Sequence, residues 1–153
     1  MIAELVARRR MDAFLRAFER KDFETMARRW ADDVVVTFPP GLPMSGEWRG
    51  RQEVRALFEA VFAHNARMRL TLHDVAVLHP WSPRGRSTVI ALWDAEEEGV
   101  DGDLVRTGVV SVAETRWWRG VRSEDYFSDV PAMARHYARM PLPPRRAAAA
   151  ATA

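Results

Sequence analysis

The sequence predicts an α+β protein in which helices pack on one face of a mainly antiparallel sheet. Three observations lead to this prediction. Apolar residues recur at helical spacing up to about residue 64, segments of alternating or β-branched residues follow, and short turns join those segments. Strands joined by short turns pair antiparallel, because parallel pairing needs a crossover of a dozen or more residues. The apolar side of the sheet then packs on the helices, and a twisted sheet under helices leaves a conical cavity.

The first two elements are expected to be helices. Asp22 separates two sets of apolar residues with helical spacing, and an aspartate there can cap the second helix. Residues 32–38, DDVVVTF, are rich in β-branched side chains and predict a strand that stops at Pro39. Residues 39–50 hold three prolines and three glycines and predict a loop. The two apolar sets are Met11, Phe14, Leu15 and Phe18, then Phe23, Met26, Ala27 and Trp30.

A third helix and four long strands are expected after this loop. The apolar face of the helix comprises Val54, Leu57, Phe58, Val61 and Phe62. The strands are predicted at 67–78, 87–96, 104–118 and 120–127, and a short closing helix begins near Pro131 within 128–140. Residues 1–140 thus form a single domain, and the Pro- and Ala-rich residues 141–153 are expected to be a disordered tail.

The composition limits the classes of function. The chain has no cysteine, which excludes disulfides and thiolate chemistry. Its four histidines show no paired metal-ligand spacing, so we expect no metal and no cofactor. Basic residues are scattered and the formal net charge is only +2, so nucleic-acid binding is not expected. No stretch approaches the roughly 20 apolar residues of a membrane span, and we expect a cytoplasmic protein.

Three stretches carry a resemblance to a known family. They are RWADDVVVTFP (29–39), WRGRQEVRALF (48–58) and VRSEDYF (121–127). In this order they resemble the nuclear transport factor 2-like superfamily, and within it the SnoaL-like branch of small polyketide cyclases, over residues from about 8 to 130. The resemblance implies a cone-shaped α+β barrel, with three N-terminal helices on a curved sheet that encloses a pocket. It also implies a homodimer through the outer sheet face, but no single reaction.

The last strand offers a candidate acid. Side chains alternate between the two faces of a strand. One face holds Val121, Ser123, Asp125 and Phe127, and the other holds Arg122, Glu124 and Tyr126. Charges dominate the second face, so Asp125 is predicted to point inward, where an apolar pocket raises the pKa of a carboxyl. Asp125 also matches the acid/base position of SnoaL-like cyclases. The alternative is a capping role, or an ion pair with an arginine such as Arg86.

Two further residues are candidates for catalysis. Asp94 resembles an acid of limonene-epoxide hydrolases, which use two aspartates bridged by an arginine. Leu92 stands where that arginine is expected, which weakens the hydrolase hypothesis, and Asp94 otherwise begins an acidic turn. His73 and Asp74 lie in mid-strand and face opposite ways, so one of them should point into the pocket. His73 could there act as an acid/base or hold a ligand carbonyl, unless it is a structural residue.

Comparison with ketosteroid isomerases, which share this superfamily, argues against that specific activity. The positions of its tyrosine and two aspartates are occupied by Phe14, Phe38 and Val110, which lack the required groups.

Aromatic residues are the predicted walls of the pocket, although core packing is the other interpretation of each. The predicted substrate-binding residues are Trp30, Phe38, Trp48, Phe14, Phe62 and Trp93. The sequence therefore predicts a cofactor-independent enzyme that uses carboxylate acid/base catalysis on a small hydrophobic or aromatic ligand, such as a polyketide. Cyclisation, isomerisation and dehydration remain open. The alternatives are a noncatalytic binding or dimerisation module, and an epoxide hydrolase variant that uses Asp94 and Asp125.

Overall fold

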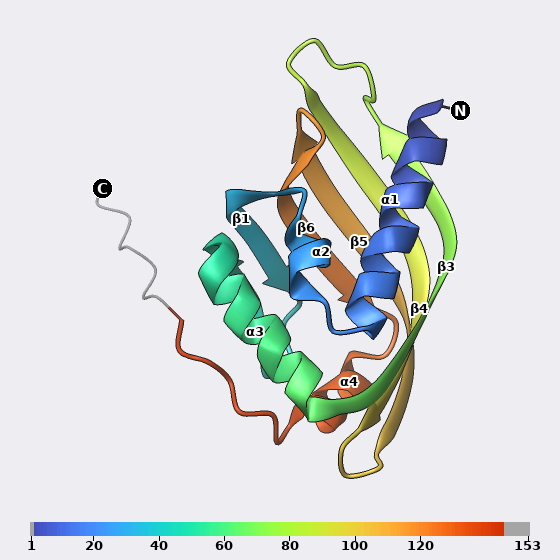
Figure 1. The fold of residues 1–153 in the computed structure, drawn as a ribbon. Helices are drawn as coiled ribbons and strands as arrows, with labels where there is room; N and C mark the ends of the chain where they lie inside the picture. The colour runs from blue at the N-terminus through green and yellow to red at the C-terminus, as the bar shows by residue number, and fades with distance from the viewer. Residues whose placement is uncertain (1, 146–153) are drawn as a thin grey trace.

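A computed structural model describes residues 2–145 of the chain. Its elements confirm the predicted α+β fold, with helices packed on a curved, mostly antiparallel sheet (Figure 1). In chain order they are α1 (Ile2–Glu19), α2 (Phe23–Ala27), β1 (Trp30–Phe38), β2 (Gly46–Arg49), α3 (Gly50–His64), β3 (Asn65–Leu78), β4 (Arg86–Gly99), β5 (Leu104–Arg116), β6 (Arg119–Phe127) and α4 (Val130–Tyr137).

The six strands of the described residues form one sheet in the order β2-β1-β6-β5-β4-β3. Neighbouring strands pair antiparallel, except for β1 and β6, which are parallel. The sheet curves around the helices but does not close, so β2 and β3 remain as its two edges (Figure 1). The predicted barrel is therefore an open, strongly curved sheet.

The helices cover the concave face of this sheet. Helix α1 packs along β3, α3 packs on β1, and α4 contacts β5 near the lower end of the sheet in Figure 1. The core between them is largely aromatic and aliphatic, and Leu57 in α3 and Val34 in β1 are almost fully buried. Among residues 2–145, no helix combines the length and the apolar character that a membrane crossing requires.

Several predicted boundaries are confirmed at the residues that cap them. Asp22 precedes α2 and accepts a hydrogen bond from the Thr25 backbone N–H, at 3.1 Å. Asp129 caps α4 in the same way, by accepting from the Ala132 N–H at 2.9 Å. These side chains satisfy N–H groups that have no partner within the helix, which fixes where each helix begins.

Two local predictions were wrong. The segment 39–50 is not a loop throughout, because Gly46–Arg49 forms β2, which pairs with β1. Trp30 begins β1 and is not part of the second helix. Gly50 allows β2 to run directly into α3, since its φ of 81° is a left-handed conformation that glycine adopts at little cost.

The C-terminal tail is described only in part. Residues 141–145 form neither helix nor strand, and the Arg145 guanidinium lies 4.1 Å from the centroid of the Trp48 ring. Residues 146–153 lie outside the described residues, so the predicted disorder of the tail stays a prediction.

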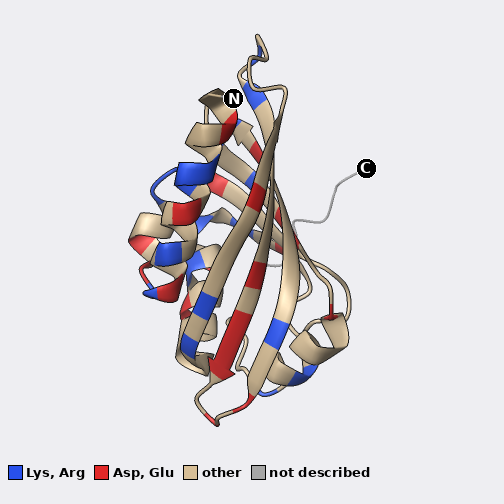
Figure 2. Ribbon diagram, turned by 90° about the vertical axis from the view of Figure 1, so that its right-hand side faces the viewer, with Lys and Arg blue, Asp and Glu red and all other residues tan. Residues whose placement is uncertain are grey.

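The convex face of the sheet is polar and mixed in charge. Seen from the side in Figure 2, the outer strands carry both basic and acidic bands. Arg106 pairs with Glu96 at 2.6 Å, and Arg67 pairs with Glu98 at 3.6 Å. Apolar side chains such as Leu92 and Tyr126 are also exposed. The homodimer that is expected through this face stays a prediction.

Candidate functional site

Two cavities lie between the helices and the concave face of the sheet. The larger one, which we call the mouth cavity, has a volume of about 400 Å³ and is lined by α1, the α2–β1 connection and parts of β4, β5 and β6. The smaller one, the inner cavity, has a volume of about 40 Å³ and reaches Met133 and Tyr137 of α4. Phe14 lines both cavities, so they adjoin.

Asp125 lies on the wall of the inner cavity, as the alternation in β6 predicts. Its neighbours there are apolar, among them Phe38 and Phe127, whose rings stack with centroids 6.5 Å apart. Burial raises the pKa of Asp125 to about 6, although a hydrogen bond from Ser111 opposes the shift. Within the described chain Asp125 forms no ion pair, so a pair with Arg86 is not found.

Ser111 in β5 connects the two cavities. Trp93 Nε1 can only donate, so the Ser111 hydroxyl oxygen accepts from it, at 2.9 Å. The Ser111 proton is then directed to Asp125 Oδ1, at 2.5 Å. Because Ser111 also lines the mouth cavity, its hydroxyl stands between that cavity and the Asp125 carboxyl. Sequence analysis did not select Ser111, yet the antiparallel register opposite Asp125 would have indicated it.

Glu97 is a second acid of the inner cavity that the sequence analysis missed. It is only 4% exposed, and burial raises its pKa to about 7. The Tyr137 hydroxyl and the Asn65 amide both donate hydrogen bonds to its Oε2. The predicted strand ended at residue 96 and an acidic turn was expected to follow it, but β4 continues to Gly99. Alternation from Ala91, Trp93 and Ala95 places Glu97 on the buried face, and this signal could have identified it.

A polar cluster continues from Glu97 into α4. Asn65 donates to the Tyr137 oxygen at 2.9 Å, and its Oδ1 accepts from His136 Nε2 at 2.8 Å. His136 is therefore protonated on Nε2, and burial, more than any other cause, lowers its pKa. These groups fix the Tyr137 side chain beside the cavity, since Tyr137 is 3% exposed.

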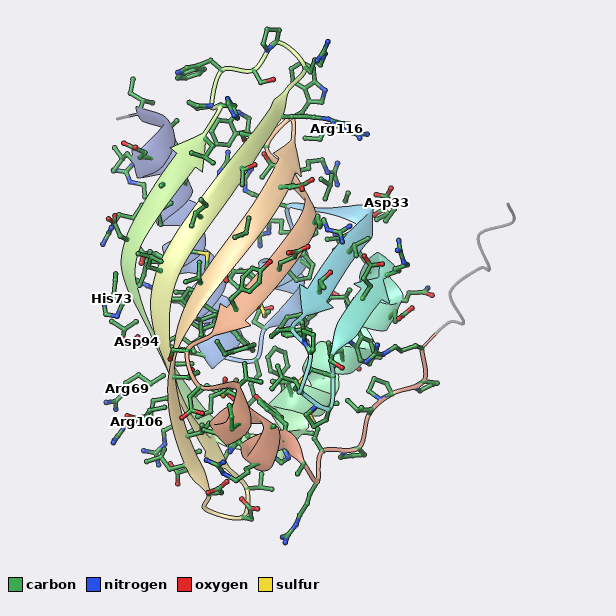
Figure 3. The ribbon with its side chains drawn as sticks, turned by 180° about the vertical axis from the view of Figure 1, so that it is seen from behind. Asp33, Arg69, His73, Asp94, Arg106 and Arg116 are labelled. Atoms are coloured by element: carbon green, nitrogen blue, oxygen red, sulfur yellow. The ribbon has the colours of Figure 1, made fainter. Side chains whose placement is uncertain are left out.

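Asp94 and His73 lie on the convex face, away from both cavities (Figure 3). His73 Nε2 lies 2.7 Å from Asp94 Oδ2, and both side chains are more than half exposed. Asp94 and Asp125 therefore do not meet around one water. His73 and Asp74 are both exposed, so the expectation that one of them points into the pocket was wrong. The reason is a bulge in β3 between Leu72 and Asp74, which interrupts the alternation.

The six predicted aromatic residues divide into two groups. Trp30 lines the mouth cavity, Phe38 and Trp93 line the inner cavity, and Phe14 lines both. Trp48 and Phe62 belong to the core and line neither cavity. The Trp48 indole is fully buried in β2 and donates to the Met44 carbonyl at 2.9 Å.

The chemistry that this arrangement supports is proton transfer. Asp125 and Glu97 titrate near neutral pH and share one apolar cavity. Among residues 2–145, no three His, Asp or Glu side chains come together in a way that could hold a metal ion.

Comparison with known proteins agrees with this fold. Residues 11–119, most of the chain, match the SnoaL-like domain family. The fold is that of nuclear transport factor 2-like and ketosteroid isomerase-like proteins. The chain therefore belongs to the SnoaL-like domain family, which relates it to isomerases and cyclases. No curated protein shows a significant match.

Solved structures show the same architecture. A nuclear transport factor 2-like protein of unknown function from Burkholderia pseudomallei is 26% identical, with a TM-score of 0.67, and the match covers 84% of this chain and 95% of that one. A ketosteroid isomerase-like protein from Erwinia carotovora is 17% identical, with a TM-score of 0.65 and coverage of 82% and 95%. TerC, co-crystallized with polyporic acid, is 20% identical, with a TM-score of 0.63 and coverage of 82% and 93%.

Proposed function

We propose that this protein is a cofactor-independent enzyme in which Asp125 transfers a proton to or from a small hydrophobic ligand. The observation that carries the proposal is the Asp125 carboxyl on the wall of an apolar cavity, with its pKa raised to about 6. A general base is most effective when its pKa lies near the working pH, because it is then ionised and still basic. At neutral pH Asp125 is largely ionised, and its partner Ser111 donates to it.

The proposed reaction is removal of a proton next to a carbonyl group. Asp125 takes the proton, and the electron pair of the C–H bond forms the enolate, whose negative charge collects on oxygen. Tyr137 and Glu97 line the same cavity. Tyr137 donates its one proton to Glu97, so the group that can donate to the enolate oxygen is Glu97, which is about half protonated at pH 7. Return of the proton to another carbon is isomerisation, and attack of the enolate on a second carbonyl is cyclisation.

The size of the inner cavity limits what reacts there. Its volume of about 40 Å³ admits a carbonyl and its neighbouring carbon, but not a whole polycyclic ligand. The body of the ligand would lie in the mouth cavity, which is within the usual size of small-molecule sites of roughly 300–1,000 Å³. The resemblance of the fold to a protein that binds polyporic acid supports an aromatic ligand, and the aromatic wall residues Phe14 and Trp30 suit one.

The test is deuterium exchange at the carbons next to the carbonyl of 2-tetralone, followed by proton NMR in D₂O. We expect the wild type to accelerate exchange and Asp125→Asn to slow the enzyme-dependent rate at least about 100-fold, as loss of a general base does. The rate should rise with pH through about 6, because the reactive form of Asp125 is the ionised one.

Asp94→Asn is the matched control. It makes the same substitution on a neighbouring strand, but on the exposed face of the sheet. An equal loss in both variants, or full activity in Asp125→Asn, would refute the role of Asp125. No acceleration by the folded wild type would instead support the noncatalytic binding module.

A further inference from the structure

The charged side chains that line the mouth cavity are all basic. Among the described residues that line it are five arginines, and no aspartate or glutamate lines it. The whole chain has 23 Lys+Arg and 21 Asp+Glu, so an average stretch of surface would carry similar numbers of both. The arginines are Arg9, Arg10, Arg28, Arg29 and Arg122. This local excess of positive charge points to a negatively charged occupant.

Four of these arginines form no ion pair with a carboxylate of the described residues. Arg122 is the exception, since it pairs with Glu47 at 2.7 Å and with Glu124 at 3.3 Å. Elsewhere on the described chain, some arginines pair with acids, as Arg55 does with Glu24. Within residues 2–145, none of the other four mouth arginines forms an ion pair with Asp or Glu.

Arg10 and Arg29 both line this cavity, and their charges repel each other. Arg10 comes from α1, is partly buried, and holds its guanidinium 5.1 Å from the centroid of the Trp118 ring. Burial and, second, the charge of Arg29 lower the pKa of Arg10. Two like charges at a partly desolvated position raise the free energy of the empty site, and an anion between them lowers it.

The remaining walls of the cavity are apolar. Phe14 and Trp30 lie with ring centroids 6.0 Å apart, and Met11 and Val89 complete this side. Ser111 stands at the end that adjoins the inner cavity. The cavity therefore offers a charged rim, an aromatic body and a polar inner end.

We propose that the mouth cavity binds an amphipathic organic anion, with its carboxylate held by Arg10 and Arg29 and its apolar body against Phe14 and Trp30. The end of the ligand opposite the carboxylate then points to Ser111 and Asp125. This inference rests on the proposed function for its orientation, and it narrows the substrate class to hydrophobic carboxylic acids with a reactive carbonyl at the far end.

The experiment is calorimetric titration of the full chain at pH 7.5 with two matched probes. The first is 1-naphthaleneacetate, and the second is its neutral amide, 1-naphthaleneacetamide, which has nearly the same shape. We expect the carboxylate to bind at least tenfold more tightly than the amide, because charge-assisted hydrogen bonds to guanidinium groups are the strong ones. Equal affinities of the two probes would overturn the proposal.

Substitutions test whether Arg10 and Arg29 hold the carboxylate of the probe. Arg10→Gln combined with Arg29→Gln should weaken carboxylate binding at least tenfold and amide binding less than twofold. Arg29→Gln alone serves if the double variant does not fold, since Arg29 is exposed. Arg69→Gln combined with Arg106→Gln removes two arginines from the convex face and should change neither affinity (Figure 3). Unchanged carboxylate binding after loss of Arg29 and Arg10 would also overturn the proposal.

Failure of this inference is distinguishable from failure of the proposed function. 2-Tetralone has no carboxylate, so its deuterium exchange tests Asp125 without the arginines. Naphthaleneacetate binding measures the mouth cavity without any reaction.

Discussion

Glu124 and Asp125 are consecutive residues of β6, but the two faces of the sheet give them opposite properties. On the convex face, the Tyr126 hydroxyl donates to Glu124 at 2.6 Å and Arg122 lies 3.3 Å away, which holds the pKa of Glu124 below its usual value. On the concave face, Asp125 has one hydroxyl partner among apolar side chains, and burial raises its pKa. An acidic stretch therefore holds two kinds of carboxyl, separated by the alternation of the strand.

Strand β4 shows the same contrast between two adjacent glutamates, Glu96 and Glu97. Glu96 accepts a hydrogen bond from Arg106, which lowers the pKa of Glu96. Glu97 is buried, and burial raises its pKa. The comparison teaches that the number of acids in a segment says little about proton transfer. What matters is which of them the register turns toward the cavity.

The largest expected effect of this difference is on stability. Trp93 faces the concave side, is 4% exposed and donates to Ser111, so Trp93→Ala should lower the free energy of unfolding by about 3–5 kcal/mol. Trp81→Ala is the matched control, because Trp81 is 74% exposed, and it should change stability by less than about 0.5 kcal/mol. Urea unfolding measures both, and similar losses would contradict the burial of Trp93.

The pH dependence of stability should separate Glu97 from Glu96. The folded pKa of Glu97 is raised from 4.5 to about 7, so its contribution to stability is present below pH 4.5 and is lost as pH rises through 7. This loss amounts to about 3 kcal/mol, and Glu97→Gln should remove it. Unfolding of wild type and variant by urea between pH 4.5 and 8 measures the difference.

The contribution of Glu96 to the pH dependence of stability should have the opposite sign, and Glu96→Gln should remove it. The folded pKa of Glu96 is lowered, so its contribution is present at neutral pH and is lost as pH falls. Parallel pH profiles for wild type and Glu97→Gln would show that Glu97 is not buried in solution.

The smallest effect is expected at Glu124. Its side chain is 34% exposed, and its ion pair with Arg122 is open to solvent. Glu124→Gln should lower stability by less than about 1 kcal/mol, and the loss should shrink in 1 M NaCl because salt screens exposed charges. Unfolding at low and high salt checks this. A loss near that of Trp93→Ala, independent of salt, would remove the distinction between the two faces.

The parts of the fold and site that sequence could predict are those set by regular patterns. Alternation in β6 placed Asp125 on the concave face, and helical spacing placed Phe14 and Phe58 in the core. Asp74 was misplaced because a bulge has no clear sequence signal and shifts the alternation by one residue, whereas alternation from Leu70 and Leu72 already puts His73 on the convex face. Glu97 was missed because three consecutive glutamates resemble a solvated turn, and only the register with β3 and β5 shows that β4 continues through them.

The arginines of the mouth cavity show another limit of prediction from sequence. Four of the five come from α1 and from the α2–β1 connection, and in sequence these four look like short basic clusters. Their common position and their lack of acidic partners depend on packing between elements, which one-dimensional spacing does not contain. The division of the predicted aromatic residues between cavity and core has the same origin.

The parallel pairing of β1 with β6 has a consequence for how the chain is made. Val36 pairs with Ser123, which lies 87 residues later, so the middle of the sheet closes only after β6 has left the ribosome. Such long-range pairing slows folding, because a large loop must be closed before the contact is gained. Asp125 belongs to β6, so a nascent chain cannot form the wall of the inner cavity before this strand has emerged.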